Sequence, residues 1–124
     1  MMDILTAVKK TDINSTVMCI GNKENLNVKD QNQMTPLMIA VDNENIKIVK
    51  MLIDAKADLN LQDKYGQTAL MLAAGRGNAE ITNILVSAKA DLTLKAKHGL
   101  TALQFAAENN KSDIVRILKN AGAK

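Results

Sequence analysis

The chain has 124 residues, 47% of them hydrophobic, and a formal net charge of +3. This length fits a single domain, residues 1–124, and no apolar stretch approaches the roughly 20 residues that a membrane span requires. One Phe, one Tyr, no Trp and scattered lysines argue against nucleic-acid binding, which usually shows a basic stripe with interleaved aromatic residues. The single Cys19 cannot form an internal disulfide and the first residues do not resemble a signal peptide, so we expect a cytoplasmic protein.

Residues 1–29 predict an N-terminal capping unit of two helices. Apolar residues at positions 4, 5, 7 and 8 predict the first helix, and Ile13, Val17 and Ile20 predict the second. Polar residues occupy the remaining face of the second helix, as a capping unit of a stacked protein needs. Cys19 lies 33 residues before Leu52, which belongs to the apolar pattern of the next unit, so we expect Cys19 in the core.

The segment that starts at Thr35 predicts two short antiparallel helices. The hydroxyl of Thr35 can accept a hydrogen bond from a free amide of the first turn, and Pro36 suits the first helical position. One unit further on, Gly77 suits the turn at the end of the first helix. Asn45 and Asn78 suit the cap of the second helix, whose apolar residues recur at intervals of three and four.

Three similar hexapeptides mark a repeat of 33 residues: TPLMIA from Thr35, TALMLA from Thr68 and TALQFA from Thr101. The period runs through the rest of the chain and predicts three units, at residues 30–62, 63–95 and 96–124. One such unit cannot bury its own apolar face, so the units must stack, and their concave side stays open. The repeat therefore indicates a binding surface.

Between the units, Leu59 and Leu61 alternate with polar residues and lead into a turn at Gly66, which predicts an arm that projects outward. The unit D-x-x-G-x-T-[PA]-L-x-x-A, followed by an amphipathic helix and A-D-L-N, resembles the ankyrin repeat, most completely from Asp63 to Lys95. The resemblance covers nearly the whole chain. It implies an all-α solenoid of stacked helix-turn-helix units with projecting β-hairpin fingers.

Three departures from the family pattern concern the fingers and their loops. The usual histidine of T-P-L-H is replaced by Met38, Met71 and Gln104, and methionine packs but cannot replace the hydrogen bonds of a histidine. Gln33 replaces a turn glycine and Ala96 a finger aspartate. We therefore expect an intact fold with fewer polar contacts between neighbouring loops and with altered geometry in these two fingers.

The resemblance also implies that a protein partner binds at the finger tips and the exposed ends of the inner helices. The matching columns give a predicted partner-binding set of Met34, Asp42, Asn43, Lys64, Tyr65, Gln67, Arg76, His98 and Leu100. Met34, Tyr65 and Leu100 are apolar or aromatic where we expect exposure, and Tyr and Arg often dominate interface energies. Tyrosine is common at this finger position in the family, so the presence of Tyr65 agrees equally well with an ordinary family residue and with a binding anchor. For His98 we expect a solvated tip residue.

Reactive residues form no recognisable catalytic or metal site in the sequence. One His and one Cys cannot make a zinc site, and the repeat register places Cys19 and His98 in different layers. We therefore predict a non-enzymatic, monomeric module that binds a protein, without a cofactor, metal or small-molecule substrate and without nucleic acid or membrane as partner. Two alternatives stay open: a homo-oligomer that uses an end of the stack, and a binder of nucleic acid or acidic surfaces.

Overall fold

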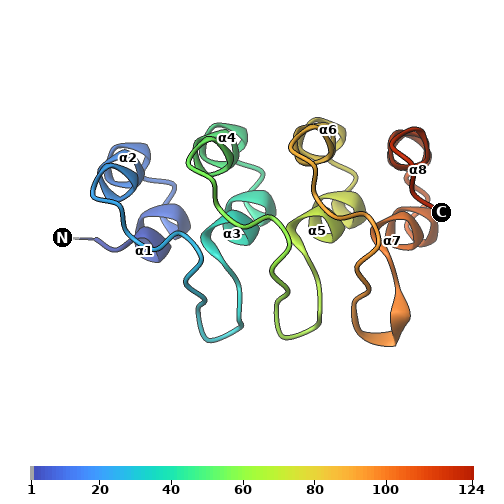
Figure 1. The fold of residues 1–124 in the computed structure, drawn as a ribbon, viewed down its shortest axis with the longest axis horizontal. Coiled ribbons are helices and arrows are strands. Elements are labelled where there is room, and N and C mark those ends of the chain that lie inside the picture. Colours follow the sequence, from blue (N-terminus) through green and yellow to red (C-terminus); the bar gives the residue numbers. More distant parts are fainter. Residues whose placement is uncertain (1) are drawn as a thin grey trace.

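The computed structural model describes residues 2–124, which form a row of antiparallel helix pairs (Figure 1). The inner helices are α1 (Ile4–Lys9), α3 (Pro36–Asp42), α5 (Ala69–Arg76) and α7 (Ala102–Glu108). The outer helices are α2 (Ile13–Gly21), α4 (Ile46–Asp54), α6 (Ala79–Ser87) and α8 (Ser112–Asn120). Each pair packs on the next along both rows, so the predicted all-α repeat solenoid is confirmed.

The helices of the middle units begin where the sequence predicts, because side chains at the caps bind free backbone amides. The Thr35 hydroxyl accepts a hydrogen bond from the Met38 amide at 3.2 Å, and Pro36 occupies the first turn of α3. Asn45 and Asn78 cap α4 and α6 through their side-chain oxygens, at 3.0 and 2.9 Å. Such caps satisfy amides that have no partner within the helix and each contribute about 1 kcal/mol.

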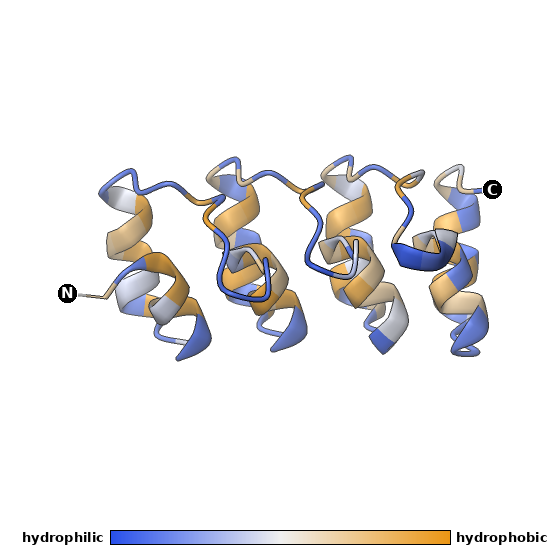
Figure 2. Cartoon of the chain, turned by 90° about the horizontal axis from the view of Figure 1, so that it is seen from below, coloured by the Kyte–Doolittle hydropathy of each residue, from blue (hydrophilic) through white to orange (hydrophobic). Residues whose placement is uncertain are grey.

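The core lies between the inner and outer rows and continues from pair to pair. One column of the repeat is buried throughout: Cys19 is 3% exposed, and Leu52, Leu85 and Leu118 are 0% exposed. Figure 2 shows the hydrophobic residues concentrated on the helices and the hydrophilic ones in the loops and fingers. Because each layer is buried by the layers beside it, the stack depends on contacts between neighbouring units.

Three fingers project from the inner row (Figure 1), but the expected β-hairpins are not confirmed, since no strand is formed in residues 2–124. Each finger closes through two backbone hydrogen bonds. In the second finger the Asp63 amide donates to Gln67 O and the Gly66 amide donates to Asp63 O, both at 2.9 Å. Asp63 Oδ1 also accepts from the amides of Tyr65 and Gln67 at 2.9 Å. The second finger is therefore a tight turn braced by a carboxylate.

The two fingers that depart from the family pattern have different geometries. Gln33 has a φ of 64°, close to the 76° of Gly66 in the same column, and Asp30 braces this finger as Asp63 braces the next. Ala96 has no carboxylate to offer. The third finger accordingly contains a 3₁₀ turn, Lys97–Gly99, in which His98 has a φ of 68°. The first finger keeps the regular turn, and the expected alteration is found in the third.

Polar contacts between the loops persist although the histidine column is absent. Lys29 Nζ donates to Gln62 O at 2.8 Å, and Gln62 Nε2 donates to Lys95 O at 3.0 Å, so these contacts join three successive loops. Met71 Sδ accepts from the Thr68 amide at 3.5 Å, within its own unit. A different column thus supplies polar contacts between the loops, and Met71 itself serves as a weak acceptor within its own unit.

Candidate partner-binding surface

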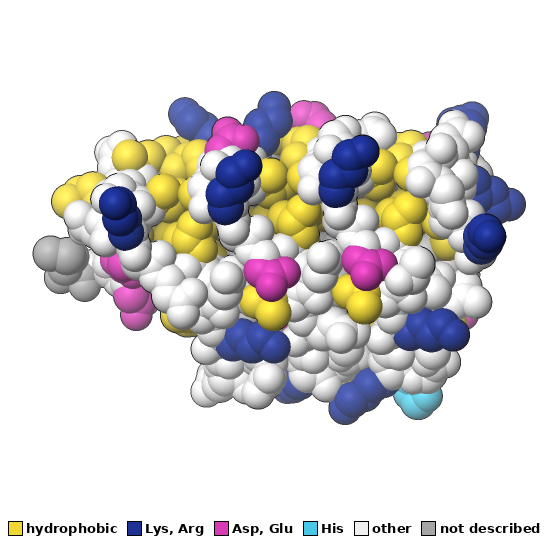
Figure 3. Space-filling view, in the orientation of Figure 1, with side chains coloured by type: hydrophobic (Ala, Val, Ile, Leu, Met, Phe, Trp, Pro, Cys, Tyr) yellow, Lys and Arg dark blue, Asp and Glu magenta, His cyan; other side chains and the backbone are white. Residues whose placement is uncertain are grey.

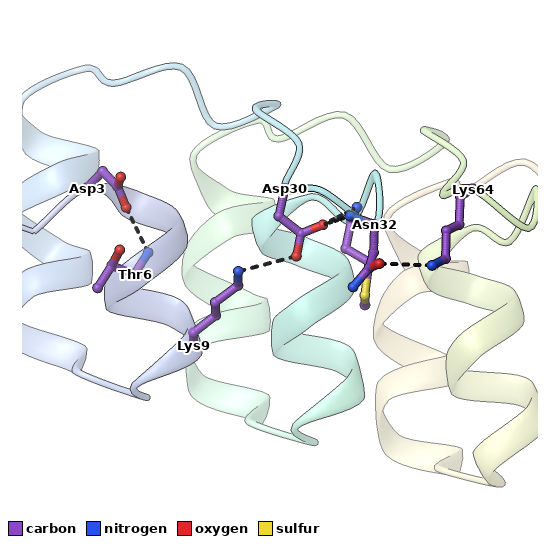
Figure 4. A network of polar contacts seen from close by, with 7 residues as sticks. Asp3, Thr6, Lys9, Asp30, Asn32 and Lys64 are labelled. Atoms are coloured by element: carbon purple, nitrogen blue, oxygen red, sulfur yellow. Dashed lines mark hydrogen bonds and ion pairs between the residues drawn. The ribbon is translucent and has the colours of Figure 1, made fainter.

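The tips of the fingers are joined to one another by hydrogen bonds. The Lys64 amide donates to Asn32 O at 3.2 Å, and the Lys97 amide donates to Tyr65 O at 3.0 Å. Lys64 Nζ also donates to Asn32 Oδ1 at 2.9 Å (Figure 4). Because these links join neighbouring fingers, the tips form one connected surface, and a partner that binds there loses less free energy in ordering it.

Tyr65 lies in the middle of this surface with its ring in solvent. The residue is 53% exposed, which is unusual for a large aromatic side chain. Lys64 Nζ and Lys97 Nζ lie 5.1 and 6.0 Å from the centroid of the Tyr65 ring. Both distances are within the range of cation–π attraction. One ammonium group comes from the same finger and the other from the next, so Tyr65 is the centre of a cationic cluster.

The ends of the inner helices carry an ion pair that joins neighbouring units. Arg76, at the end of α5, donates to Oδ1 of Asp42, at the end of α3, from Nε at 2.9 Å and from Nη2 at 2.7 Å. The two side chains are 48% and 40% exposed, so water screens the pair. Arg76 is thus engaged within the chain, and a partner that contacts it must share it with Asp42.

Asp30 connects the first finger to the capping unit. Its carboxylate pairs with Lys9 at 3.3 Å (Figure 4), and the Asp30 side chain is only 9% exposed. Burial alone would raise the pKa of Asp30, but hydrogen bonds from the amides of Met34 and Asn32, together with Lys9, stabilise the charged form. The pKa of Asp30 is therefore held below its ordinary value, and the ionised carboxylate braces the finger at neutral pH.

Sequence comparison agrees with this architecture. A family model described as ankyrin repeats (3 copies) matches residues 4–96 and 55–124. The chain belongs to the ankyrin-repeat family. Members of this family generally act as protein–protein interaction modules. No curated protein matches the sequence, so the comparison identifies no specific partner.

The predicted partner-binding set divides by exposure on this ankyrin-repeat surface. Its exposed members are Asn43, Lys64, Tyr65, Arg76 and His98, and its partly buried members are Met34, Asp42, Gln67 and Leu100. Met34 packs against the core and Leu100 is partly buried, so the expectation that these two residues are exposed is wrong. The reason is their place on the returning arm of a finger, directly before the start of α3 or α7. The exposure of Tyr65 and the solvated position of His98 are confirmed, while their contact with a partner stays a prediction.

A second apolar surface lies on the outer helix α2, where the sequence analysis expected polar residues. Val17 is 53% exposed and Met18 is 60% exposed. Val17, Ile20 and Met51 line an open groove between α2 and α4. The expectation that polar residues occupy the free face of this helix is therefore wrong. The signal was present in the repeat, since the residues that share the column of Val17 are polar: Lys50, Asn83 and Arg116.

Within residues 2–124, no three His, Cys, Asp or Glu side chains are grouped so that they could hold a metal ion. None of the helices described there has the length and apolar character to cross a bilayer. Cys19 is buried as predicted, and burial, with Glu24 nearby, raises the pKa of its thiol to about 11. Since the thiolate is the reactive form, this cysteine is a poor nucleophile at neutral pH.

Proposed function

We propose that this ankyrin-repeat chain binds a protein partner through its finger and inner-helix face, with Tyr65 as the anchor. The proposal depends on the exposure of the Tyr65 ring at a finger tip, because the turn itself closes without that ring. The finger closes through backbone atoms and the Asp63 carboxylate. The first finger forms the same turn with Asn32 in the equivalent position. An exposed ring gains about 25 cal/mol per Å² only when a partner covers it.

The residues around Tyr65 suit a partner that lies across several units. Lys64 and Lys97 offer ammonium donors on adjacent fingers, and the Asp42–Arg76 pair offers polar groups at the ends of the inner helices. Both contacts of Arg76 use Oδ1 of Asp42, which leaves Oδ2 available to a donor of the partner. An aromatic residue surrounded by polar groups is the arrangement typical of protein interfaces.

A quantitative pull-down tests the proposal. The wild-type chain, Tyr65→Ala and the outer-helix variant Lys50→Ala serve as baits in extract of the source cells. We expect a protein that the wild type and Lys50→Ala retain equally and that Tyr65→Ala retains at least tenfold less, because truncation of a central aromatic anchor costs about 2 kcal/mol or more. Unchanged melting temperatures must accompany this result. A specific partner that ignores Tyr65→Ala and is lost with Lys50→Ala would place the working surface on the outer helices.

The exposed apolar residues of α2 favour a second candidate function, self-association. Residues Ile13–Gly21 of α2 carry no charged side chain, whereas the other outer helices each carry at least one. In a two-fold dimer a helix meets its own copy, where like charges would repel, so an uncharged helix suits such a contact. Sedimentation of the wild type and of Val17→Lys tests this candidate. Lysine is the chosen replacement because Lys50 occupies the same repeat position in α4. Dimers that the substitution abolishes would support this candidate, and a wild type that stays monomeric would exclude it.

A further inference from the structure

The exposed charge on the fingers has one sign. In the three finger segments, residues 28–35, 61–68 and 94–101, the exposed charged residues are all lysines, at positions 29, 64, 95 and 97. The carboxylates of these segments, Asp30 and Asp63, are partly buried and bind finger amides. Figure 3 shows basic side chains and the histidine along the lower edge of the molecule, where Figure 1 places the fingers. Lysines therefore supply the exposed formal charge of the fingers.

Lys64 and Lys97 lie on neighbouring finger tips that hydrogen bonds join. Lys64 is fixed to the first finger through its amide and its Nζ, and the amide of Lys97 is fixed to Tyr65 O. The ion pairs within residues 2–124 are Lys9–Asp30 and Asp42–Arg76, so neither lysine meets a carboxylate there. Two like charges that lie close to one ring repel each other. A carboxylate from outside would relieve this repulsion.

We propose that the fingers bind an acidic segment of the protein partner, with a carboxylate seated beside Lys64 and Lys97 and its aliphatic stem against the Tyr65 ring. This inference rests on the proposed function and adds the chemistry of the partner. Opposite charge across an interface speeds the encounter and selects against basic partners. The ring offers apolar area next to the charges, which suits a glutamate side chain with its two methylene groups.

Nucleic acid is the other polymer that basic side chains attract, and the finger face fits it less well. Binding of a single strand relies on several aromatic side chains that stack successive bases. The chain has one Tyr and one Phe, and Phe105 is partly buried against the core. Tyr65 offers a platform for one base only. The observations therefore favour an acidic peptide over a nucleic acid.

An NMR titration of the ¹⁵N-labelled chain tests the inference with two probes of equal length, a dodecaglutamate peptide and a twelve-nucleotide strand of thymidines. At about 20 mM salt we expect the peptide to shift the amides of residues 64–67 and 96–99, and the affinity to fall as salt rises. Absence of these shifts at about 1 mM peptide, the weakest affinity that the proposal allows, would overturn it. Tighter binding of the nucleotide strand would also overturn it.

Two double variants of equal net charge test whether the peptide binds at the finger lysines. Lys64→Gln with Lys97→Gln removes the finger pair, and Lys47→Gln with Lys50→Gln removes two exposed charges from α4. We expect the first to weaken peptide binding about fivefold and the second less than twofold, from the usual strength of exposed ion pairs. Equal losses of affinity in the two double variants would show that peptide binding depends only on the net charge of the chain. If the partner from the pull-down needs Tyr65 yet ignores the finger pair, the acidic segment is wrong and the proposed function stands.

Discussion

Replacement of Leu85 by alanine should destabilise the stack by about 3 kcal/mol. Leu85 is 0% exposed in α6, and the leucines of the same column in α4 and α8, Leu52 and Leu118, are also 0% exposed. The substitution removes three buried carbon atoms, which contribute about 0.8 kcal/mol each, or about 2.4 kcal/mol. A cavity term adds to this, since helices held on both sides cannot close the gap fully, and buried Leu→Ala changes cost about 2–5 kcal/mol.

Thermal unfolding followed by circular dichroism measures this loss. Unfolding entropy of about 2.1 cal/mol/K per residue gives about 0.26 kcal/mol/K for this chain, so 3 kcal/mol lowers the melting temperature by about 12 °C. Asn83→Ala is the matched control, because Asn83 is exposed on the same helix and alanine favours the helix. We expect Asn83→Ala to change the midpoint little or raise it slightly. Equal midpoints for the two variants would refute the register of the repeat.

Three further predictions concern Cys19, Asp30 and the finger glycines. Cys19 should react slowly with thiol reagents in native protein and quickly in denaturant, because burial raises its pKa to about 11; rapid native labelling would mean that the capping unit opens. Asp30→Asn should lower the melting temperature at pH 7, and the gap to wild type should close as pH falls below about 4. The pKa of Asp30 is lower in the folded than in the unfolded chain, so the ionised carboxylate stabilises the fold above the unfolded pKa, and this stabilisation is lost as pH falls through the folded pKa. A difference in melting temperature that stays constant with pH would show that the ionisation of Asp30 is not its cause. Gly66→Ala should destabilise the fold more than Gly99→Ala. Both glycines have a positive φ, but only at Gly66 would the new Cβ lie 3.0 Å from backbone atoms of the next finger. Equal melting temperatures of the two variants would argue against that close approach.

Most of the helical scaffold follows from the sequence, because its determinants are local and repeated. Caps such as Thr35 and Asn45 act within one turn, and their hydrogen bonds are found as predicted. The period of 33 residues places Cys19 and Leu85 in one column, so the burial of one predicts that of the other. The finger tips follow from the repeat as well, which is why the exposure of Tyr65 could be anticipated.

Contacts between adjacent columns could not be predicted from the period. Asp42 pairs with Arg76, 34 residues away, and Glu44 accepts from Asn78 at the same separation, so both contacts run diagonally from one unit to the next. A search at the repeat length alone compares identical columns and misses them. The exposure of Val17 was missed for another reason: an apolar residue at helical spacing predicts burial, and only its polar counterparts in the later units argue against that.

Hydrogen exchange of the complex with the partner captured by the pull-down tests the central claim most directly. If the finger face is the working surface, the partner should slow exchange at the tips, residues 64–67 and 97–100, and at the ends of the inner helices around Asp42 and Arg76. The amides of α2 should exchange as in the free chain. Protection of α2 with unchanged exchange at the fingers would contradict the account and assign binding to the outer row.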